Sequence, residues 1–318
     1  MQFRFRLLTA TLIISTAAAH AGEPSKQAQF EEPAPAVNPF DAAIRPITSP
    51  TLFDLAVPRT QAHAIFMYQN HPDKLRTTLG DLPVGGDLQV YALQLEIALS
   101  DKFSLVAAKD GYIDFKPDAT LSKSNGWANI SAGFKYAFLY RPEDALASAF
   151  NLQIEVPTGN SSVFQGEGDG AAVPSVSFLK LWDRWQLAGN LGFKIPFDNG
   201  AESTTLHYNA HFSYAVTDRF SPLLEVNYFR VLDEGNGGRR FNDQVGGLVP
   251  SVATFEGGDL INFGASNVSN KDLVTLGVGF RYRLTETIDF GAAYEIPLTE
   301  EEENLMESRI TIDATIRF

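Results

Sequence analysis

The sequence contains no cysteine. Disulfides, thiolate metal sites, a cysteine nucleophile and the lipid-modified cysteine of a lipoprotein are therefore excluded. After the N-terminus the chain also lacks an uninterrupted apolar run of about 18 residues, so no later segment is a candidate membrane-spanning helix. If the protein crosses a membrane, it must do so as β-strands.

Positive charge is scarce as well. The chain carries 25 basic and 38 acidic residues, which gives a net charge of -13. A surface of this sign repels nucleic acid, so we expect no nucleic-acid partner. The glycine-rich segments 166–170 and 234–238 lack the strand–glycine–helix context of a phosphate loop, and we expect no cofactor.

The N-terminus has the pattern of an export signal. Arg4 and Arg6 precede the apolar stretch Leu7–Ala19, and Ala19-His20-Ala21 fits a small-x-small cleavage site. This pattern predicts a signal peptide over residues 1–21.

Residues 22–62 differ in composition from the rest of the chain. Their prolines are too closely spaced for regular strand pairing. We predict a proline-rich periplasmic leader or a partial plug, and in the second case Thr51–Arg59 packs inside the mouth of a barrel.

Residues 63–318 carry a period-two pattern that is typical of β-strands. In the final segment, Ser308–Phe318, apolar residues alternate with polar or charged residues, so one face is apolar and the other wet. Most runs have the length of a tilted membrane strand. The twelve runs are His63–Asn70, Leu88–Leu99, Phe103–Tyr112, Trp127–Tyr140, Ser148–Val156, Val173–Trp182, Trp185–Pro196, Thr204–Val216, Phe220–Leu232, Asp272–Leu284, Ile288–Leu298 and Ser308–Phe318.

The connections between the runs alternate in length. Short links such as Asp183–Arg184 are followed by long ones such as Phe197–Ser203. Outer-membrane barrels have short periplasmic turns and long extracellular loops. We therefore predict an all-β, transmembrane antiparallel β-barrel of about twelve strands with both termini in the periplasm. The longest link, Asp233–Lys271, either folds into or caps the lumen or holds one more hairpin, which would make fourteen strands.

Several of these segments resemble a known family. The stretches that carry the likeness are GWANISAGFKYAFLY (Gly126–Tyr140), LQIEVPTGN (Leu152–Asn160), PSVSFLKLWDRWQLAGNLGFKIP (Pro174–Pro196) and VTLGVGFRYRLTE (Val274–Glu286). They are similar to the phenol meta-cleavage (MetA-pathway of phenol degradation) family of outer-membrane transporters. The resemblance implies a barrel that moves aromatic or other hydrophobic compounds. It supplies no set of functional residues.

The polar face of the strands supplies the candidate lumen residues. Opposite charges on neighbouring strands can brace the wall or form a constriction that sorts solutes. The candidates are Glu96, Lys135, Glu155, Lys194, His207, His211, Glu225, Arg281, Arg283, Asp289, Arg309, Asp313 and Arg317. The terminal Phe318 is a candidate signal for the barrel-assembly machinery.

The sequence thus favours an outer-membrane channel or transporter for a small solute, in contact with lipid and lipopolysaccharide. A structural or adhesive barrel that acts through its loops is the alternative. A more remote one is an esterase, because His211 and Ser213 share a face. We assign no catalytic residue and no metal ligand, and we interpret His207 and His211 as polar lumen residues.

Overall fold

The computed structural model describes residues 38–318, so the predicted signal peptide and residues 22–37 of the predicted leader lie outside the described part. Sixteen strands are present in this part. They are β1 (Gln61–Asn70), β2 (Lys74–Thr77), β3 (Gly80–Pro83), β4 (Asp87–Ser100), β5 (Phe103–Lys109), β6 (Tyr112–Lys116), β7 (Ser124–Trp127), β8 (Ile130–Arg141), β9 (Leu146–Val156), β10 (Ala171–Trp182), β11 (Trp185–Pro196), β12 (Thr204–Tyr214), β13 (Phe220–Asp233), β14 (Asp272–Arg283), β15 (Ile288–Pro297) and β16 (Ser308–Arg317). The short helical turns are η1 (Pro39–Ala42), η2 (Pro142–Asp144), η3 (Ser161–Val163), η4 (Val245–Gly247), α1 (Val249–Val252) and η5 (Glu301–Glu303).

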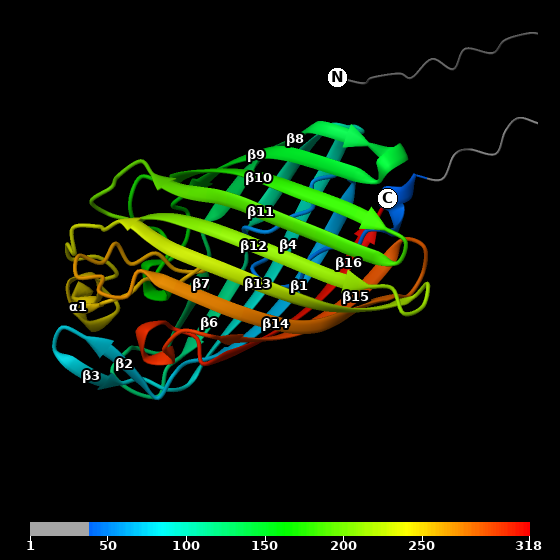
Figure 1. The fold of residues 1–318 in the computed structure, drawn as a ribbon. Helices are drawn as coiled ribbons and strands as arrows, with labels where there is room; N and C mark the ends of the chain where they lie inside the picture. Colours follow the sequence, from blue (N-terminus) through cyan, green and yellow to red (C-terminus); the bar gives the residue numbers. More distant parts are fainter. Residues whose placement is uncertain (1–37) are drawn as a thin grey trace, which may run out of the picture. The chain divides into compact units, whose positions relative to one another are not determined.

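The sheet closes on itself because β1 pairs with both β16 and β4 (Figure 1). β5 and β6 both pair with β4, and β7 and β8 continue as their neighbours, so each of these pairs is one interrupted barrel strand. The result is an antiparallel barrel of twelve strands. The prediction of an all-β transmembrane barrel is confirmed.

The fourteen-strand alternative is wrong. The long β13–β14 connection forms η4, α1 and irregular turns rather than a hairpin that joins the wall. Positive φ angles at Phe241, Gly247 and Gly264 repeatedly reverse its direction, which is incompatible with two extended strands. The extra hairpin of the chain is β2–β3, which lies in the β1–β4 connection and outside the barrel sheet.

Two predicted strands are interrupted rather than continuous. Phe103–Tyr112 breaks at Asp110 and Gly111, and Trp127–Tyr140 breaks just after Trp127. Gly111 has φ 128°, and a Cβ at this position would lie 2.9 Å from the carbonyl oxygen of Tyr91. The backbone therefore comes too close to β4 for any residue larger than glycine, and the strand kinks at that point.

The two ends of the barrel differ, as the alternating connection lengths predict. The end that holds the C-terminus carries the tight turns, and the opposite end carries α1 and the β2–β3 hairpin (Figure 1). We call them the turn end and the loop end. Between them the outward side chains are apolar, as at Leu95, Phe138 and Val278.

Among residues 38–318, no helix has both the length and the apolar character needed to cross a membrane.

The orientation of the barrel can be tested with single thiols, because the natural sequence has no cysteine. Leu79, at the tip of β2–β3, is 73% exposed at the loop end, and Asp101 lies exposed in the β4–β5 turn. We expect a membrane-impermeant maleimide to label Leu79→Cys in intact cells and Asp101→Cys only after permeabilisation. The opposite labelling pattern would place the loop end in the periplasm.

Candidate functional site

The lumen is occupied by the chain itself. Residues 38–60, here called the lumen segment, precede β1 and bury Phe40, Phe53 and Leu55 inside the barrel. These side chains pack against small residues of the wall, including Ala137 and Ala149. Alanines on the inner face leave the room that the aromatic rings of the segment fill.

Glu225 of β13 fixes the middle of the lumen segment. Its buried carboxylate accepts hydrogen bonds from the Ile47 amide at 3.0 Å, the Thr48 amide at 2.7 Å and the Thr48 hydroxyl at 2.6 Å. His211 lies 2.6 Å from the same carboxylate. One wall carboxylate therefore satisfies three donors of the segment, and removing it would leave them buried without partners.

A second anchor consists of alternating charges. Arg45 of the lumen segment contacts Asp54 at 3.1 Å, and Lys135 of β8 contacts Asp54 at 2.7 Å. Lys135 also contacts Glu96 of β4 at 2.9 Å. Each of these buried charges has an opposite charge beside it, which is the condition for burying it at acceptable cost.

The β13–β14 connection reaches into the lumen from the loop end. Its Asp259 forms a 3.0 Å ion pair with Arg309 of β16. The Thr51 hydroxyl of the lumen segment donates to the carbonyl oxygen of Asp259. The segment and the connection thus meet inside the barrel.

The other predicted lumen residues also lie on the inner face. Most are paired: Glu155 with Lys109 and Lys194, Arg281 and His63 with Asp313, Arg283 and Arg317 with Asp289, and Arg309 with Glu295. His207 is buried, and neither ring nitrogen has a hydrogen-bond partner. Phe318 is 84% exposed beyond the end of β16. Within residues 38–318 no cluster of three metal-ligating side chains is present.

His211, Ser213 and Glu225 have the connectivity of a Ser–His–acid triad. The second ring nitrogen of His211 lies 3.0 Å from the Ser213 hydroxyl, and the first lies against Glu225. However, Ser213 is only 3% exposed and Glu225 already binds the lumen segment. A substrate cannot reach this hydroxyl while the segment is in place.

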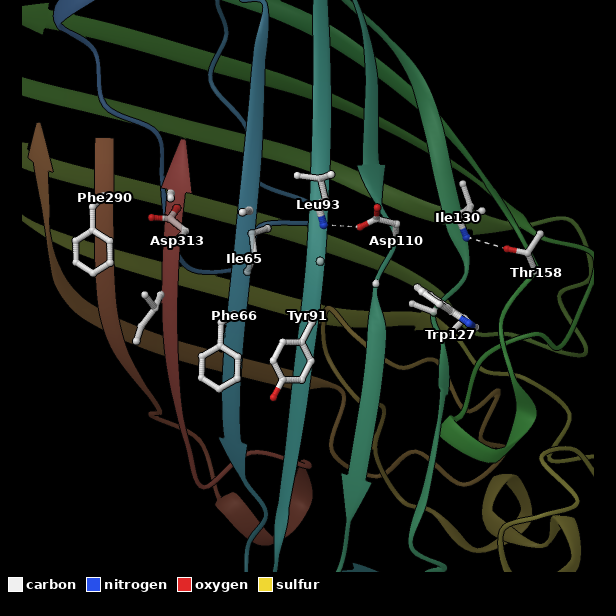
Figure 2. A pocket seen from close by; sticks show the side chains of 16 residues that line it. Ile65, Phe66, Tyr91, Leu93, Asp110, Trp127, Ile130, Thr158, Phe290 and Asp313 are labelled. Atoms are coloured by element: carbon white, nitrogen blue, oxygen red, sulfur yellow. Dashed lines mark hydrogen bonds between the residues drawn. The ribbon is translucent and has the colours of Figure 1, made fainter. Parts of the chain in front are cut away.

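The barrel wall is held by side chains where β5/β6 and β7/β8 are interrupted (Figure 2). The Leu93 amide donates to the Asp110 carboxylate at 3.0 Å, and the Ile130 amide donates to the Thr158 hydroxyl at 3.1 Å. The Trp127 amide donates to the Asn160 side chain at 2.7 Å. At this place side-chain hydrogen bonds supplement a thinned backbone ladder, in which the Ala128 amide donates to the Gly111 carbonyl oxygen at 2.8 Å.

A groove of about 780 Å³ lies on the outside of the wall at this break. Phe66, Tyr91, Leu93, Trp127 and Phe290 line it with apolar surface (Figure 2). We call it the wall groove. The wall groove could not be predicted from the sequence, because an outward apolar residue gives the same period-two pattern whether it faces lipid or a groove. The Asp110-Gly111 pair inside an apolar run was the available signal.

A second apolar space lies at the loop end, between the β2–β3 hairpin and α1. It has a volume of about 100 Å³ and is lined by residues that include Leu75, Leu82, Val252 and Phe263. We call it the outer cavity.

Buried apolar side chains connect the two spaces. Phe255 and Phe263, which line the outer cavity, belong to the same core cluster as Phe115, Phe164 and Ala128. Ala128 in turn lines the wall groove. The rings of Phe164 and Phe263 have centroids 5.2 Å apart, and those of Phe115 and Phe164 are 5.5 Å apart. We call these four phenylalanines the aromatic cluster.

Glu256 holds the turn between Phe255 and Phe263. Its buried carboxylate accepts hydrogen bonds from the Ser203 hydroxyl at 2.7 Å and from the Phe263 and Ala265 amides. Burial raises the pKa of Glu256 to about 7, and these hydrogen bonds offset only part of that effect. One loop carboxyl with a raised pKa thus contacts the backbone beside Phe263 of the aromatic cluster.

The chain belongs to a known family. The family model described as "Putative MetA-pathway of phenol degradation" matches residues 70–284. The resemblance found in the sequence is therefore confirmed. No protein among the curated sequences matches the chain.

A solved outer-membrane channel shows the same fold. The COG4313 outer membrane channel from Pseudomonas putida F1 has a TM-score of 0.56 at 11% identity, with 82% of this chain and 96% of that chain covered. The NanC porin has a TM-score of 0.49 at 7% identity, with 81% of this chain and 100% of that chain covered. At these identities the likeness to the channel from Pseudomonas putida concerns the fold alone.

We expect Glu225→Gln to loosen the lumen segment. The neutral amide accepts hydrogen bonds more weakly, at a cost on the order of 2 kcal/mol, or roughly a 30-fold rise in the released population. Single-channel recording in planar bilayers should show correspondingly more frequent opening.

The control is Glu234→Gln, which removes an acid of the β13–β14 connection that pairs with Lys271. Its conductance should match the natural protein. If Glu225→Gln also leaves conductance unchanged, Glu225 does not hold the segment in the lumen.

The raised pKa of Glu256 predicts a pH-dependent loop. When the loop opens, the Glu256 carboxyl returns to its ordinary pKa of 4.5. The closed loop is therefore most stable below about pH 4.5 and loses stability as pH rises towards about 7. Hydrogen exchange of the Phe263 and Ala265 amides, corrected for intrinsic rates, should be about tenfold or more faster at pH 8 than at pH 5. Glu256→Gln should abolish this dependence. Equal pH dependence in both proteins would contradict the assignment.

Proposed function

We propose that this barrel is an outer-membrane channel for small hydrophobic molecules. The observation that carries the proposal is the contrast between the lumen and the wall. The lumen is filled by the lumen segment and by paired charges. The outer cavity and the wall groove, in contrast, are apolar and are joined by the aromatic cluster.

The energetics of the two paths favour an apolar solute. A polar solute in the lumen must displace hydrogen bonds such as those from Thr48 to Glu225, each of which leaves a buried group unpaired. An apolar solute that enters between the rings of the aromatic cluster meets mainly apolar surface, although the buried His71 ring packs against Phe115 with centroids 5.2 Å apart. Single-ring aromatic compounds are the first class to test, and the family description, which refers to phenol degradation, supports them.

In this proposal the solute leaves the barrel through the wall groove. The side chains of Asp110, Thr158 and Asn160 accept hydrogen bonds across the break, where the strands are interrupted, so opening the wall there would disrupt less of the backbone ladder than opening it elsewhere. The structure therefore supports release of the solute through the wall.

The proposal includes an orientation and partners. The loop end faces the outside, both termini face the periplasm, and the apolar outer surface contacts lipid and lipopolysaccharide. The exposed Phe318 stays a predicted contact for the barrel-assembly machinery.

Passage of a solute without catalysis fits the described residues better than an esterase or a structural or adhesive barrel does. The Ser213 hydroxyl is enclosed, which disfavours an esterase. A structural or adhesive barrel has no need for an apolar cavity with an exposed mouth at its loop end.

Filling the wall groove should reduce uptake. Leu93→Trp adds bulk to the groove lining, whereas the control Leu187→Trp adds the same bulk to an outward position away from it. In cells that depend on this barrel, we expect Leu93→Trp to slow uptake of radiolabelled toluene several-fold at low concentration, and Leu187→Trp to leave it unchanged.

A hydrophilic sugar serves as the second solute in the same cells. If both substitutions leave toluene uptake unaltered while the barrel is required for sugar uptake, the solute class is wrong. If deletion of the barrel affects neither solute, the structural or adhesive alternative is favoured.

A further inference from the structure

The outer cavity is an apolar space that is open on one side, and its position at the loop end needs a physical reason. Proteins rarely leave apolar voids larger than a water molecule, because the lining loses contacts that packing would supply. Apolar cavities of this kind stay dry and accept small hydrophobic molecules, as an engineered cavity of about 150 Å³ accepts benzene. At about 100 Å³, with a mouth that opens outward, the outer cavity suits a ring or a short branched chain.

Hydrogen bonds and ion pairs fix the walls of the cavity relative to one another. The Thr78 amide donates to the carbonyl oxygen of Val252 at 2.9 Å, and the Thr254 hydroxyl donates to the carbonyl oxygen of Arg76 at 2.9 Å. Arg76 also forms ion pairs with Glu300, Glu302 and Glu303 of the β15–β16 connection. The β2–β3 hairpin is thus joined to two other connections, and the space between them is preformed.

The mouth of the cavity exposes large apolar side chains to water. Leu79 is 73% exposed, Val245 is 41% exposed and Leu248 is 40% exposed, and all three line the cavity. They belong to the loop end rather than to the barrel strands, so burial in lipid does not explain them. Exposed apolar groups around a concave space mark a binding site.

Two rings of the aromatic cluster, those of Phe255 and Phe263, form the floor of the cavity. Phe255 and Phe263 meet edge to face with centroids 6.1 Å apart, and both line the cavity. An aromatic ligand can therefore make edge-to-face contacts with rings that are already oriented.

We propose that the outer cavity is a binding site for a compact hydrophobic ligand, a single-ring aromatic or a short branched alkyl group. The site captures this ligand from the outside and presents it to the aromatic cluster. This inference rests on the proposed function and assigns it a first, saturable binding step.

A single thiol in the lining tests occupancy directly. We replace Val252, which lines the cavity, with cysteine in the otherwise cysteine-free full-length chain and embed the protein in lipid nanodiscs. Toluene is the probe. We expect saturating toluene to slow maleimide modification of Val252→Cys at least about fivefold, with a saturable concentration dependence.

The matched control is Ser269→Cys, an exposed position of the same connection that does not line the cavity. Its modification rate should not respond to toluene. A response of equal size at both positions, or none at Val252→Cys, would overturn the assignment.

Val252→Phe tests the role in capture, because the larger side chain fills the cavity while the backbone contact with Thr78 remains. Heat-modifiable migration in gels confirms that the variant folds. We expect a several-fold rise in the toluene concentration at half-maximal uptake with little change in the maximal rate. An unchanged half-maximal concentration would contradict capture at this site.

The two proposals can fail separately. If toluene protects Val252→Cys but deletion of the barrel does not affect uptake, the binding site stands and the proposed function fails. If uptake requires the barrel but toluene gives no protection, the function stands and the outer cavity is not its entry site.

Discussion

The structure depends on the closure of the backbone ladder, in which β1 pairs with β16 on one side and β4 on the other. In a membrane every amide and carbonyl must find a partner within the protein, so the sheet cannot keep an edge. Closure fixes the alternation of inward and outward side chains along all strands. It also makes the break at Asp110 significant, because side-chain hydrogen bonds supplement the backbone ladder there.

A closed barrel of twelve strands is narrow, and this width determines what its polar face can do. Inward charges such as Lys135 and Glu225 are too enclosed to be hydrated freely, so each must be paired. The lumen segment supplies the missing partners, Asp54 for Lys135 and the Thr48 amide for Glu225. The charges and the segment are thus mutually dependent, since the segment neutralises the wall and the wall holds the segment.

The barrel could be predicted from the sequence because period-two alternation is a local signal that closure preserves. Strands such as β11 therefore have the predicted bounds, and the inward placement of Glu96 or Arg281 follows from the same pattern. The contacts of Ile47 and Thr48 with Glu225 could not be predicted, because backbone amides leave no trace in composition and their partner lies far along the chain. The wall groove was also hidden, since Leu93 and Trp127 look lipid-facing in any register.

The difference between the charged lumen and the apolar aromatic cluster explains how one barrel can select hydrophobic solutes without a dedicated polar site. Displacing the lumen segment requires the separation of buried ion pairs between the segment and the wall, such as Asp54–Lys135, and the charges that stay behind lose those partners. Passage through the aromatic cluster requires only that rings such as Phe164 and Phe263 change rotamer while a solute of similar polarity replaces their contacts. The second process costs an apolar solute little, whereas a hydrated solute would have to shed its water to enter. Selectivity therefore arises from the filled lumen as much as from the outer cavity and the wall groove, because the charged lumen segment and wall block the path that a polar solute would take.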